Sequence, residues 1–238
     1  TLELGLARAL ARGWGRPVLC ADPVPGRAES LASEVDGRAL ASNAEVAAES
    51  DLVVLCHKPA QLQEVAAEIG AAARAVASIL AATPLEVVRA AYPGRPVYRF
   101  VPSLPVEVRR GAVVQAAGPG DAAVSDLFAE LGTLVVLDDA LLDTATGLMS
   151  CAPAYVALVA EAQVDAGVRR GLPPLQASQL VVETLGGTAE LLQRRDYDTL
   201  AVRREVASPG GMTARGLDAL ERGGLRAAFS DALDSVLD

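Results

Sequence analysis

The hydrophobic pattern of the chain changes near residue 138, and this change limits the folds that are open to it. Before residue 138, short apolar segments alternate with helical segments, and the segment 51–56 (DLVVLC) is the clearest example. A continuous apolar run of this length is typical of a strand buried on both faces of a parallel sheet. After residue 138 no convincing strand follows, and the segments 140–170, 174–194 and 212–236 have long helical patterns.

The first part, residues 1–137, has the alternation of strands and helices that is typical of a doubly wound α/β sheet. The second part, residues 138–238, is predicted to be all-helical. Its segment 152–166 is apolar on more than one face, as in helices buried inside something larger than a small bundle. We therefore expect a Rossmann-type domain followed by an all-helical dimerisation domain. The predicted strands are 17–21, 38–41, 51–56, 75–80, 97–101, 112–116 and 133–137.

Composition argues against several classes of protein. The 238 residues include 21 basic and 30 acidic side chains, for a net charge of -9, which disfavours a nucleic-acid partner bound through a bulk basic surface. No uncharged apolar run approaches the roughly 18 residues of a membrane span, so we expect no membrane partner. One histidine and three scattered cysteines (Cys20, Cys56 and Cys151) suggest neither a metal site nor a disulfide framework. We therefore expect a cytoplasmic protein with reduced cysteines.

The sequence opens on a helical pattern at 2–14, whereas a nucleotide-binding α/β domain normally opens with a strand and a Gly-rich turn. Gly5 fits the last glycine of a GxGxxG fingerprint, although it also fits an ordinary small residue in a helix. Asp22 follows the next predicted strand, where an acidic side chain would meet the ribose of a dinucleotide. The first residue given is Thr1 rather than Met, and its opening pattern leads us to expect no signal peptide. We expect the first strand and its glycines to precede the sequence given.

A long motif near the carboxyl terminus resembles a known family. The stretch 206–236 reads VASPGGMTARGLDALERGGLRAAFSDALDSV. It resembles the signature of pyrroline-5-carboxylate reductases, in which a serine-proline-glycine-glycine-x-threonine turn leads into a helix with a leucine-glutamate-x-glycine-glycine pattern. Further features agree in order along the chain, namely Asn43 before a helix, Lys58-Pro59 after a strand, Ala81-Ala82 after a strand, and Pro153-Ala154-Tyr155 at the opening of a long helix.

This resemblance covers essentially the whole sequence and implies a function. It implies reduction of the cyclic imine 1-pyrroline-5-carboxylate to L-proline, with a hydride from NADPH or NADH. It also implies a homodimer built from intertwined carboxyl-terminal helices, and larger rings of dimers occur in the family. The active site would lie between the cofactor domain of one subunit and helices of its partner.

The turn from Ser208 to Thr213 is predicted to bind the substrate. Its glycines, Gly210 and Gly211, expose backbone N–H groups at a helix N-terminus, where an anion such as the substrate carboxylate is favoured. Met212 belongs to the same predicted set. The resemblance assigns the Thr213 hydroxyl to the imine nitrogen, which makes Thr213 a catalytic residue. The alternative is that Ser208 and Thr213 only cap the helix.

Lys58 is the only lysine of the chain and lies at the end of a predicted buried strand, where open α/β sheets bind ligands. The resemblance places a Lys-Pro pair beside the nicotinamide, so Lys58 is a predicted catalytic residue; the alternative is a solvated surface charge. His57 is predicted to contact the cofactor or to have a structural role. The predicted cofactor-binding set is Leu4, Gly5, Asp22, Asn43, Cys56, His57, Lys58, Pro59, Ala81 and Ala82.

Two of these residues are expected to contact the adenine half of the cofactor. Asn43 matches a family asparagine near the adenine ribose, and it is also a good helix N-cap; both roles are compatible. The Asp22 carboxylate would repel a 2′-phosphate and accept hydrogen bonds from a free 2′-hydroxyl. We therefore expect some preference for NADH.

Three segments depart from the family pattern near the expected site. The chain has PSLP at 102–105 for the family's PNTP, MSCA at 149–152 for SGSG, and AAT at 81–83 for AAG. Loss of a polar partner from a closed site costs about 1–3 kcal/mol. The changes are therefore expected to reshape the pocket for another cyclic imine, to slow the reaction, or to mark a non-catalytic dimeric paralogue. The residues concerned include Ser103, Met149, Cys151 and Thr83.

Overall fold

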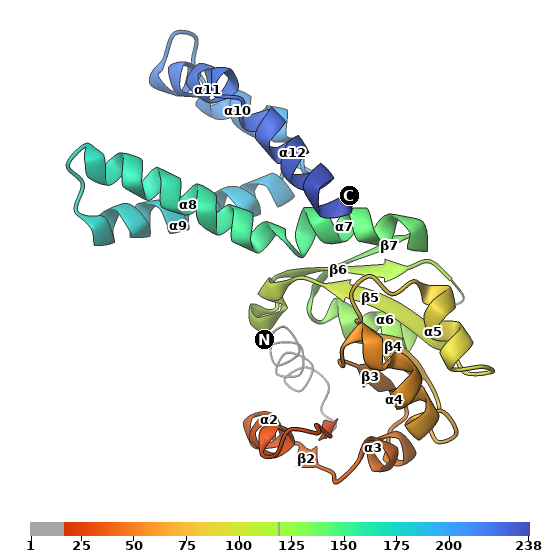
Figure 1. Cartoon of the computed structure of the whole chain (residues 1–238). Helices are drawn as coiled ribbons and strands as arrows, with labels where there is room; N and C mark the ends of the chain where they lie inside the picture. The colour runs from red at the N-terminus through yellow and green to blue at the C-terminus, as the bar shows by residue number, and fades with distance from the viewer. Residues whose placement is uncertain (1–16, 119) are drawn as a thin grey trace. The chain divides into compact units, whose positions relative to one another are not determined.

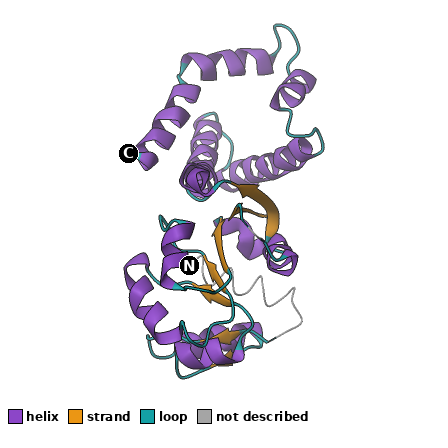
Figure 2. Ribbon diagram, turned by 90° about the vertical axis from the view of Figure 1, so that its right-hand side faces the viewer, coloured by secondary structure: helices purple, strands orange, loops and turns teal. Residues whose placement is uncertain are grey.

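The structure, a computed structural model, describes residues 17–118 and 120–238 (Figure 1). It comprises two compact units, of which the first ends at Pro153 and the second is Ala154–Asp238. The described strands all belong to the first unit, whereas the second consists of helices (Figure 2). The predicted α/β fold followed by a helical region is therefore confirmed. The helix predicted at 2–14, with Leu4 and Gly5, lies outside the described residues.

Five strands form one sheet in the order β3-β4-β5-β6-β7, and two more form a separate parallel pair, β1-β2. Strands β3, β4 and β5 are parallel, β6 is antiparallel to β5, and β7 is parallel to β6. All seven predicted strands exist, but the alternation of elements did not predict the reversal at β6. The strands are β1 (Leu19–Cys20), β2 (Arg38–Ala39), β3 (Val53–Leu55), β4 (Val76–Ser78), β5 (Val97–Pro102), β6 (Gly111–Ala116) and β7 (Gly132–Leu137).

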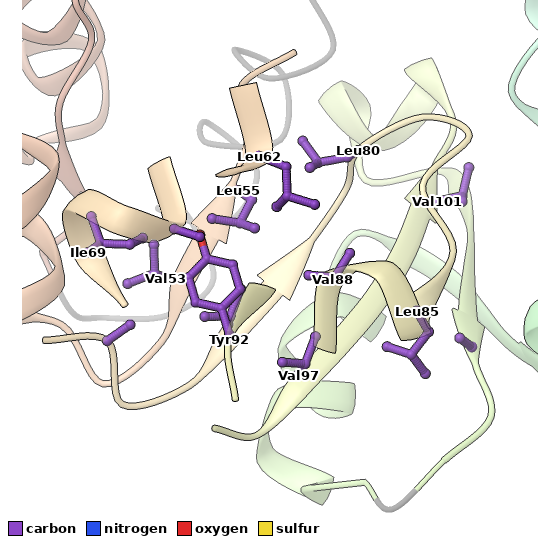
Figure 3. Packing of buried hydrophobic residues seen from close by; sticks show 14 of the residues in the cluster. Val53, Leu55, Leu62, Ile69, Leu80, Leu85, Val88, Tyr92, Val97 and Val101 are labelled. Carbon is purple, nitrogen blue, oxygen red and sulfur yellow. The ribbon is translucent and has the colours of Figure 1, made fainter. Parts of the chain in front are cut away.

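Helices cover both faces of the five-stranded sheet, as expected for a doubly wound fold. Helices α4, α5 and α7 contribute Leu62, Leu85 and Leu142 to the core of one face, part of which Figure 3 shows. Helix α6 and the short helix η2 pack on the other face. The helices of this unit are α2 (Arg27–Val35), α3 (Asn43–Glu49), η1 (Pro59–Gln61), α4 (Leu62–Ile69), α5 (Leu85–Ala91), η2 (Leu104–Val108), α6 (Ala122–Ala129), η3 (Asp139–Leu141) and α7 (Leu142–Met149).

Strand β5 is the centre of this unit, and all six of its residues are buried. Successive side chains of a strand point to opposite faces. Accordingly, Val97 and Val101 belong to the core with α4, α5 and α7, whereas Tyr98 and Phe100 belong to the core with α6. The ring of Phe100 stacks on Phe128 with the ring centroids 3.7 Å apart. The strand therefore joins the two halves of the core.

The long helix predicted at 140–170 is divided in the structure. Helix α7 ends at Met149, and α8 (Ala152–Arg169) begins three residues later. The N–H groups of Ser150 and Cys151 both donate to the carbonyl of Thr146, and Pro153 has no N–H with which to continue the ladder. Because α7 packs on the sheet, it belongs to the first compact unit, which thus extends beyond residue 138.

The second unit contains five helices within the described residues. Helix α10 was not predicted; the Asp198 carboxylate caps it by accepting from the N–H groups of Leu200 and Ala201. The helix predicted at 212–236 is broken by Gly223 and Gly224, and the latter has a φ of 79°. The helices are α8 (Ala152–Arg169), α9 (Pro174–Gln193), α10 (Thr199–Val206), α11 (Met212–Arg222) and α12 (Leu225–Leu237).

The second unit exposes a large apolar surface. Only two hydrophobic residues of this unit, Ala177 and Val202, are buried, while Leu158 on α8 and Leu180 on α9 are 63% and 60% exposed. The helical stretch Asp139–Arg169 is long and apolar enough to span a membrane by length and composition alone. A helix that is covered by another protein chain passes the same test. The single chain therefore leaves apolar helix faces without a covering layer.

Candidate active site

The carboxyl ends of β3, β4 and β5 meet at one edge of the sheet, because the three strands are parallel. In open α/β sheets, ligands bind at this edge. The residues that follow β3 include Cys56, His57, Lys58 and Pro59, and those that follow β4 include Ala81 and Ala82. The structure thus brings six of the predicted cofactor residues to a common edge.

The chain after β3 turns directly into helix η1. Pro59 is the first residue of η1, and its missing N–H costs nothing at this position. The N–H of Lys58 donates to Gln61 Oε1 at 3.2 Å, and the N–H of Gln61 donates back to the Lys58 carbonyl at 2.9 Å. These two bonds fix the backbone around Lys58. Its side chain is exposed and forms no ion pair with any described residue, so its charge is available to a ligand.

The His57 side chain is only partly exposed, and its ring is oriented by its own backbone. Its Nδ1 lies 2.9 Å from the carbonyl oxygen of Lys58, so that Nδ1 carries the proton and donates it. Its Nε2 is buried and has no hydrogen-bond partner in the described part of the chain. A neutral ring that donates through Nδ1 leaves Nε2 as an acceptor.

The turn after β4 is closed by Thr83, one of the departures from the family pattern. Its Oγ1 donates to the Ala81 carbonyl at 2.9 Å, and the residue is buried. Ala82 has a φ of 47°, which lies in the left-handed backbone region that residues other than glycine rarely adopt. Ala81 and Ala82 are exposed and small. The turn therefore offers backbone rather than side chains to a ligand.

Ser103, a second departure from the family pattern, also has a structural hydrogen bond. It follows β5, is 3% exposed, and its Oγ accepts from the Ala112 N–H at 2.9 Å. Leu104, the next residue, is 50% exposed where the family pattern has threonine. The loop after β5 therefore offers an apolar side chain at the ligand-binding edge.

Asp22 follows β1 along the chain, and Asn43 follows β2. Asp22 Oδ1 accepts from the Val24 N–H at 2.8 Å, and Oδ2 lies 3.9 Å from the Arg27 guanidinium. Asn43 is not the N-cap of α3: Ser42 caps the helix by accepting from the Glu45 N–H, and Asn43 is the first helical residue. The Asn43 amide instead donates to Glu68 at 2.8 Å. The predicted N-cap was thus wrong by one position, because serine preceding the asparagine is an equally good cap.

The predicted substrate turn lies in the second unit, before helix α11. Gly210 has a φ of 69°, and its carbonyl accepts from the Arg215 guanidinium at 2.9 Å. Gly211 is the N-cap residue, and no side chain caps the helix. Ser208 therefore does not have the capping role that was the alternative to substrate binding. Thr213 lies in the first turn of α11, as predicted, and is exposed together with Met212.

The buried charged residue in β5 was not predicted from the sequence. Arg99, in the middle of β5, is only 1% exposed and forms ion pairs with Asp139 and Asp143. An arginine within the otherwise apolar strand sequence VYRFVP is the signal that could have revealed it, because a buried charge requires partners.

Comparison with known proteins identifies family models and solved structures that this chain resembles. Residues 139–238 match the family model for pyrroline-5-carboxylate reductase dimerisation, and residues 5–82 match that for NADP oxidoreductase, coenzyme F420-dependent. Among solved structures, the chain is similar to 1-pyrroline-5-carboxylate reductase from Streptococcus pyogenes, with a TM-score of 0.88, 24% identity, and coverage of 100% of this chain and 94% of that one. A Plasmodium falciparum pyrroline carboxylate reductase with NADP bound has a TM-score of 0.84 at 23% identity, with coverage of 98% and 90%. At these identities, the structures show the fold.

Sequence relatives extend the comparison to the family. Pyrroline-5-carboxylate reductase of Synechocystis is 33% identical over 97% of this chain and 90% of the relative. That of Thermus thermophilus is 36% identical, also over 97% of this chain and 90% of the relative. The similarity thus spans both compact units and includes the carboxyl-terminal motif. The chain belongs to the pyrroline-5-carboxylate reductase family.

Proposed function

We propose that this protein reduces 1-pyrroline-5-carboxylate to L-proline with NADPH or NADH as the hydride donor. The observation that carries the proposal is the similarity to relatives named pyrroline-5-carboxylate reductase, which extends over 97% of the chain at 33% and 36% identity. The reaction adds a hydride to the imine carbon and leaves the ring nitrogen as an amine. The protein must therefore hold a nicotinamide, orient the imine and bind a carboxylate.

The edge formed by β3, β4 and β5 fits a dinucleotide. The exposed turn at Ala81 and Ala82 has no large side chain that would block a cofactor, and the unpaired charge of Lys58 suits a phosphate or a carboxylate. NAD(P)H bound at this edge would supply the hydride. We assign the contacts at this edge to Cys56, His57, Lys58, Pro59, Ala81 and Ala82, with Asp22 and Asn43 on the adenine side.

The turn from Ser208 to Thr213 fits the substrate. The N-terminus of α11 has no side-chain cap, so its first N–H groups are available to the substrate carboxylate. Gly210, Gly211 and Met212 contribute backbone to this anion site, and Ser208 contributes a hydroxyl. The Thr213 hydroxyl would donate to or accept from the imine nitrogen, and so keep the ring oriented while the nitrogen becomes an amine.

We further propose that the protein works as a homodimer in the cytoplasm. The family model matched by residues 139–238 is one of dimerisation, and the exposed Leu158 and Leu180 are the kind of surface that a second chain would cover. No disulfide joins the cysteines of the described residues, which suits a reducing compartment. Light scattering on the purified protein tests the dimer, and an assembly of several dimers is the further outcome that the family allows.

The test of the reaction is an assay of NADPH and NADH oxidation with 1-pyrroline-5-carboxylate on the full-length protein, with proline measured as the product. Absence of both turnover and nucleotide binding would contradict the enzyme proposal. A variant pair gives a sharper result: Lys58→Ala should weaken the reaction, whereas Lys58→Arg, which keeps the charge, should retain part of it.

A second function is favoured by the loop after β5. The Ser103 hydroxyl is bonded to the Ala112 N–H, and Leu104 is exposed. This part of the edge is therefore more apolar than one with the threonine of the family pattern would be. These features suit a reductase of a different, more apolar cyclic imine. A panel of cyclic imines with and without a carboxylate would distinguish the two, because the proposed anion site at α11 requires the carboxylate.

A further inference from the structure

Arg99 carries a charge into the core of the first unit. It lies on the face of β5 that also presents Val97 and Val101, and its side chain is 2% exposed. Two carboxylates compensate the charge: Asp139 Oδ1 lies 2.8 Å from Nη1, and Asp143 Oδ1 lies 3.0 Å from Nη2. The Nε of Arg99 is buried without a partner among the described residues. Removal of a carboxylate from a buried pair of this kind is strongly destabilising, because it leaves an uncompensated buried charge.

Asp139 has a second contact that Asp143 lacks. Its Oδ2 accepts from the backbone N–H of Leu85 at 2.9 Å. Leu85 is the first residue of α5, so this N–H has no partner within its own helix. Asp139 therefore joins the buried Arg99 to the beginning of α5.

The beginning of α5 is also the end of the turn that follows β4. This turn contains Ala82 in a left-handed conformation, with a φ of 47°. A conformation of this kind persists only where the surrounding structure holds it. Two contacts hold it: Thr83 Oγ1 donates to Ala81 on one side, and the Leu85 N–H donates to Asp139 on the other.

We propose that Asp139, held by Arg99, is a positioning residue that fixes the 81–84 turn for the cofactor. It acts through the backbone of Leu85 and does not itself touch the cofactor. The inference rests on the proposed function, because it takes Ala81 and Ala82 as part of the NAD(P)H site. Asp143 shares the contact with Arg99 but has none with Leu85, so its contribution is to stability alone.

The experiment compares Asp139→Ala with the matched control Asp143→Ala in the full-length protein. The melting temperature and the dissociation constants for NADPH and NADH are measured for each. Both variants should melt at a lower temperature, because both leave the Arg99 charge undercompensated. Only Asp139→Ala should bind the nucleotide more weakly, by about tenfold, the effect of one lost hydrogen bond. Asp139→Asn, which keeps an acceptor for the Leu85 N–H, should restore nucleotide binding but not the melting temperature.

A double variant keeps the proposal testable if Asp139→Ala does not fold. Arg99→Met combined with Asp139→Ala removes the buried charge together with its partner, and should fold while still leaving the Leu85 N–H without an acceptor. It should show the same weakened nucleotide binding. Unchanged binding in the folded Asp139 variants, or equal weakening in Asp143→Ala, would overturn the proposal. A wild-type protein that binds neither nucleotide would overturn the proposed function itself, and this inference with it.

Discussion

The hydroxyl of Ser208 occupies the space that a side chain at Gly211 would need. A Cβ built on Gly211 would lie 2.4 Å from Ser208 Oγ, and the Gly211 N–H donates to the Ser208 carbonyl at 3.0 Å. The turn before α11 is therefore so tight that its second glycine cannot be replaced without moving Ser208. If this turn binds the substrate carboxylate, its shape and the substrate affinity are linked.

This contact predicts the effect of Gly211→Ala. The new methyl group should displace Ser208 and raise the KM for the imine by about tenfold, equivalent to the loss of about one hydrogen bond. The control is Gly216→Ala in the same helix, where no heavy atom lies within 4 Å of the added Cβ. Gly216→Ala should leave KM unchanged and stabilise α11 by about 1 kcal/mol. Steady-state kinetics and thermal unfolding check both, and equal KM values in the two variants would contradict the prediction.

Thr213 is predicted to act through its hydroxyl. Thr213→Val keeps the shape of the side chain but removes the hydroxyl, and should lower kcat by about 100-fold, the usual cost of a lost transition-state donor. Thr213→Ser keeps the hydroxyl and should retain most of kcat. Because Thr213 is exposed in the first turn of α11, neither change should shift the melting temperature appreciably. A valine variant as active as the serine variant would remove this role from Thr213.

Much of the fold could be predicted from the sequence because the sheet is built from short apolar strands. The six residues of β5 are all buried, and apart from Arg99 they are apolar or aromatic, so they do not record whether a neighbouring strand is parallel or antiparallel. For this reason the strand at 112–116 was predicted, but its antiparallel pairing with β5 was not. Pairing direction depends on the path of the chain between strands, which the local pattern does not record.

The helices show a similar limit. The apolar pattern of 140–170 continues through Ser150 and Cys151, so that one helix was predicted, although Pro153 cannot supply an N–H for a continuous ladder. At the site, the motif from Ser208 to Thr213 predicted the turn and the helix that follows it. The roles of Arg99 and Asp139 could not be predicted, because the two residues are 40 positions apart and meet only in the folded unit.

Asp22 is predicted to influence the choice of nucleotide. Its carboxylate follows β1 and is held by the Val24 N–H at 2.8 Å. A fixed negative charge at this position would repel the 2′-phosphate of NADPH. Asp22→Ser should therefore shift the ratio of kcat/KM values toward NADPH, whereas Asp22→Glu should keep the wild-type preference. A shift toward NADH in the serine variant would contradict the assignment of Asp22 to the ribose.

Tyr92 provides a stability prediction that does not depend on the function. The side chain lies in the core with Val53, Ile69 and Val88 (Figure 3), is 1% exposed, and its hydroxyl has no partner among the described residues. A buried hydroxyl without a partner costs about 1–3 kcal/mol. Tyr92→Phe should therefore raise the free energy of unfolding of the first unit at neutral pH, by about 1 kcal/mol if the cavity adjusts.

The same variant should change the response to alkaline pH. Burial raises the pKa of Tyr92 from 10.0 to about 12. Because the folded-state pKa is the higher one, the contribution of Tyr92 to stability is complete below pH 10 and is lost as the pH rises through about 12. Tyr92→Phe removes this titration, so its unfolding free energy should fall less steeply over that interval. The control is Tyr197→Phe: Tyr197 is 67% exposed, and its replacement should change neither quantity. Urea denaturation across this pH range tests both statements. A Tyr92→Phe protein that is less stable at neutral pH would show that the hydroxyl makes a stabilising contact. One that loses stability as steeply as the wild type would show that the alkaline loss does not come from Tyr92.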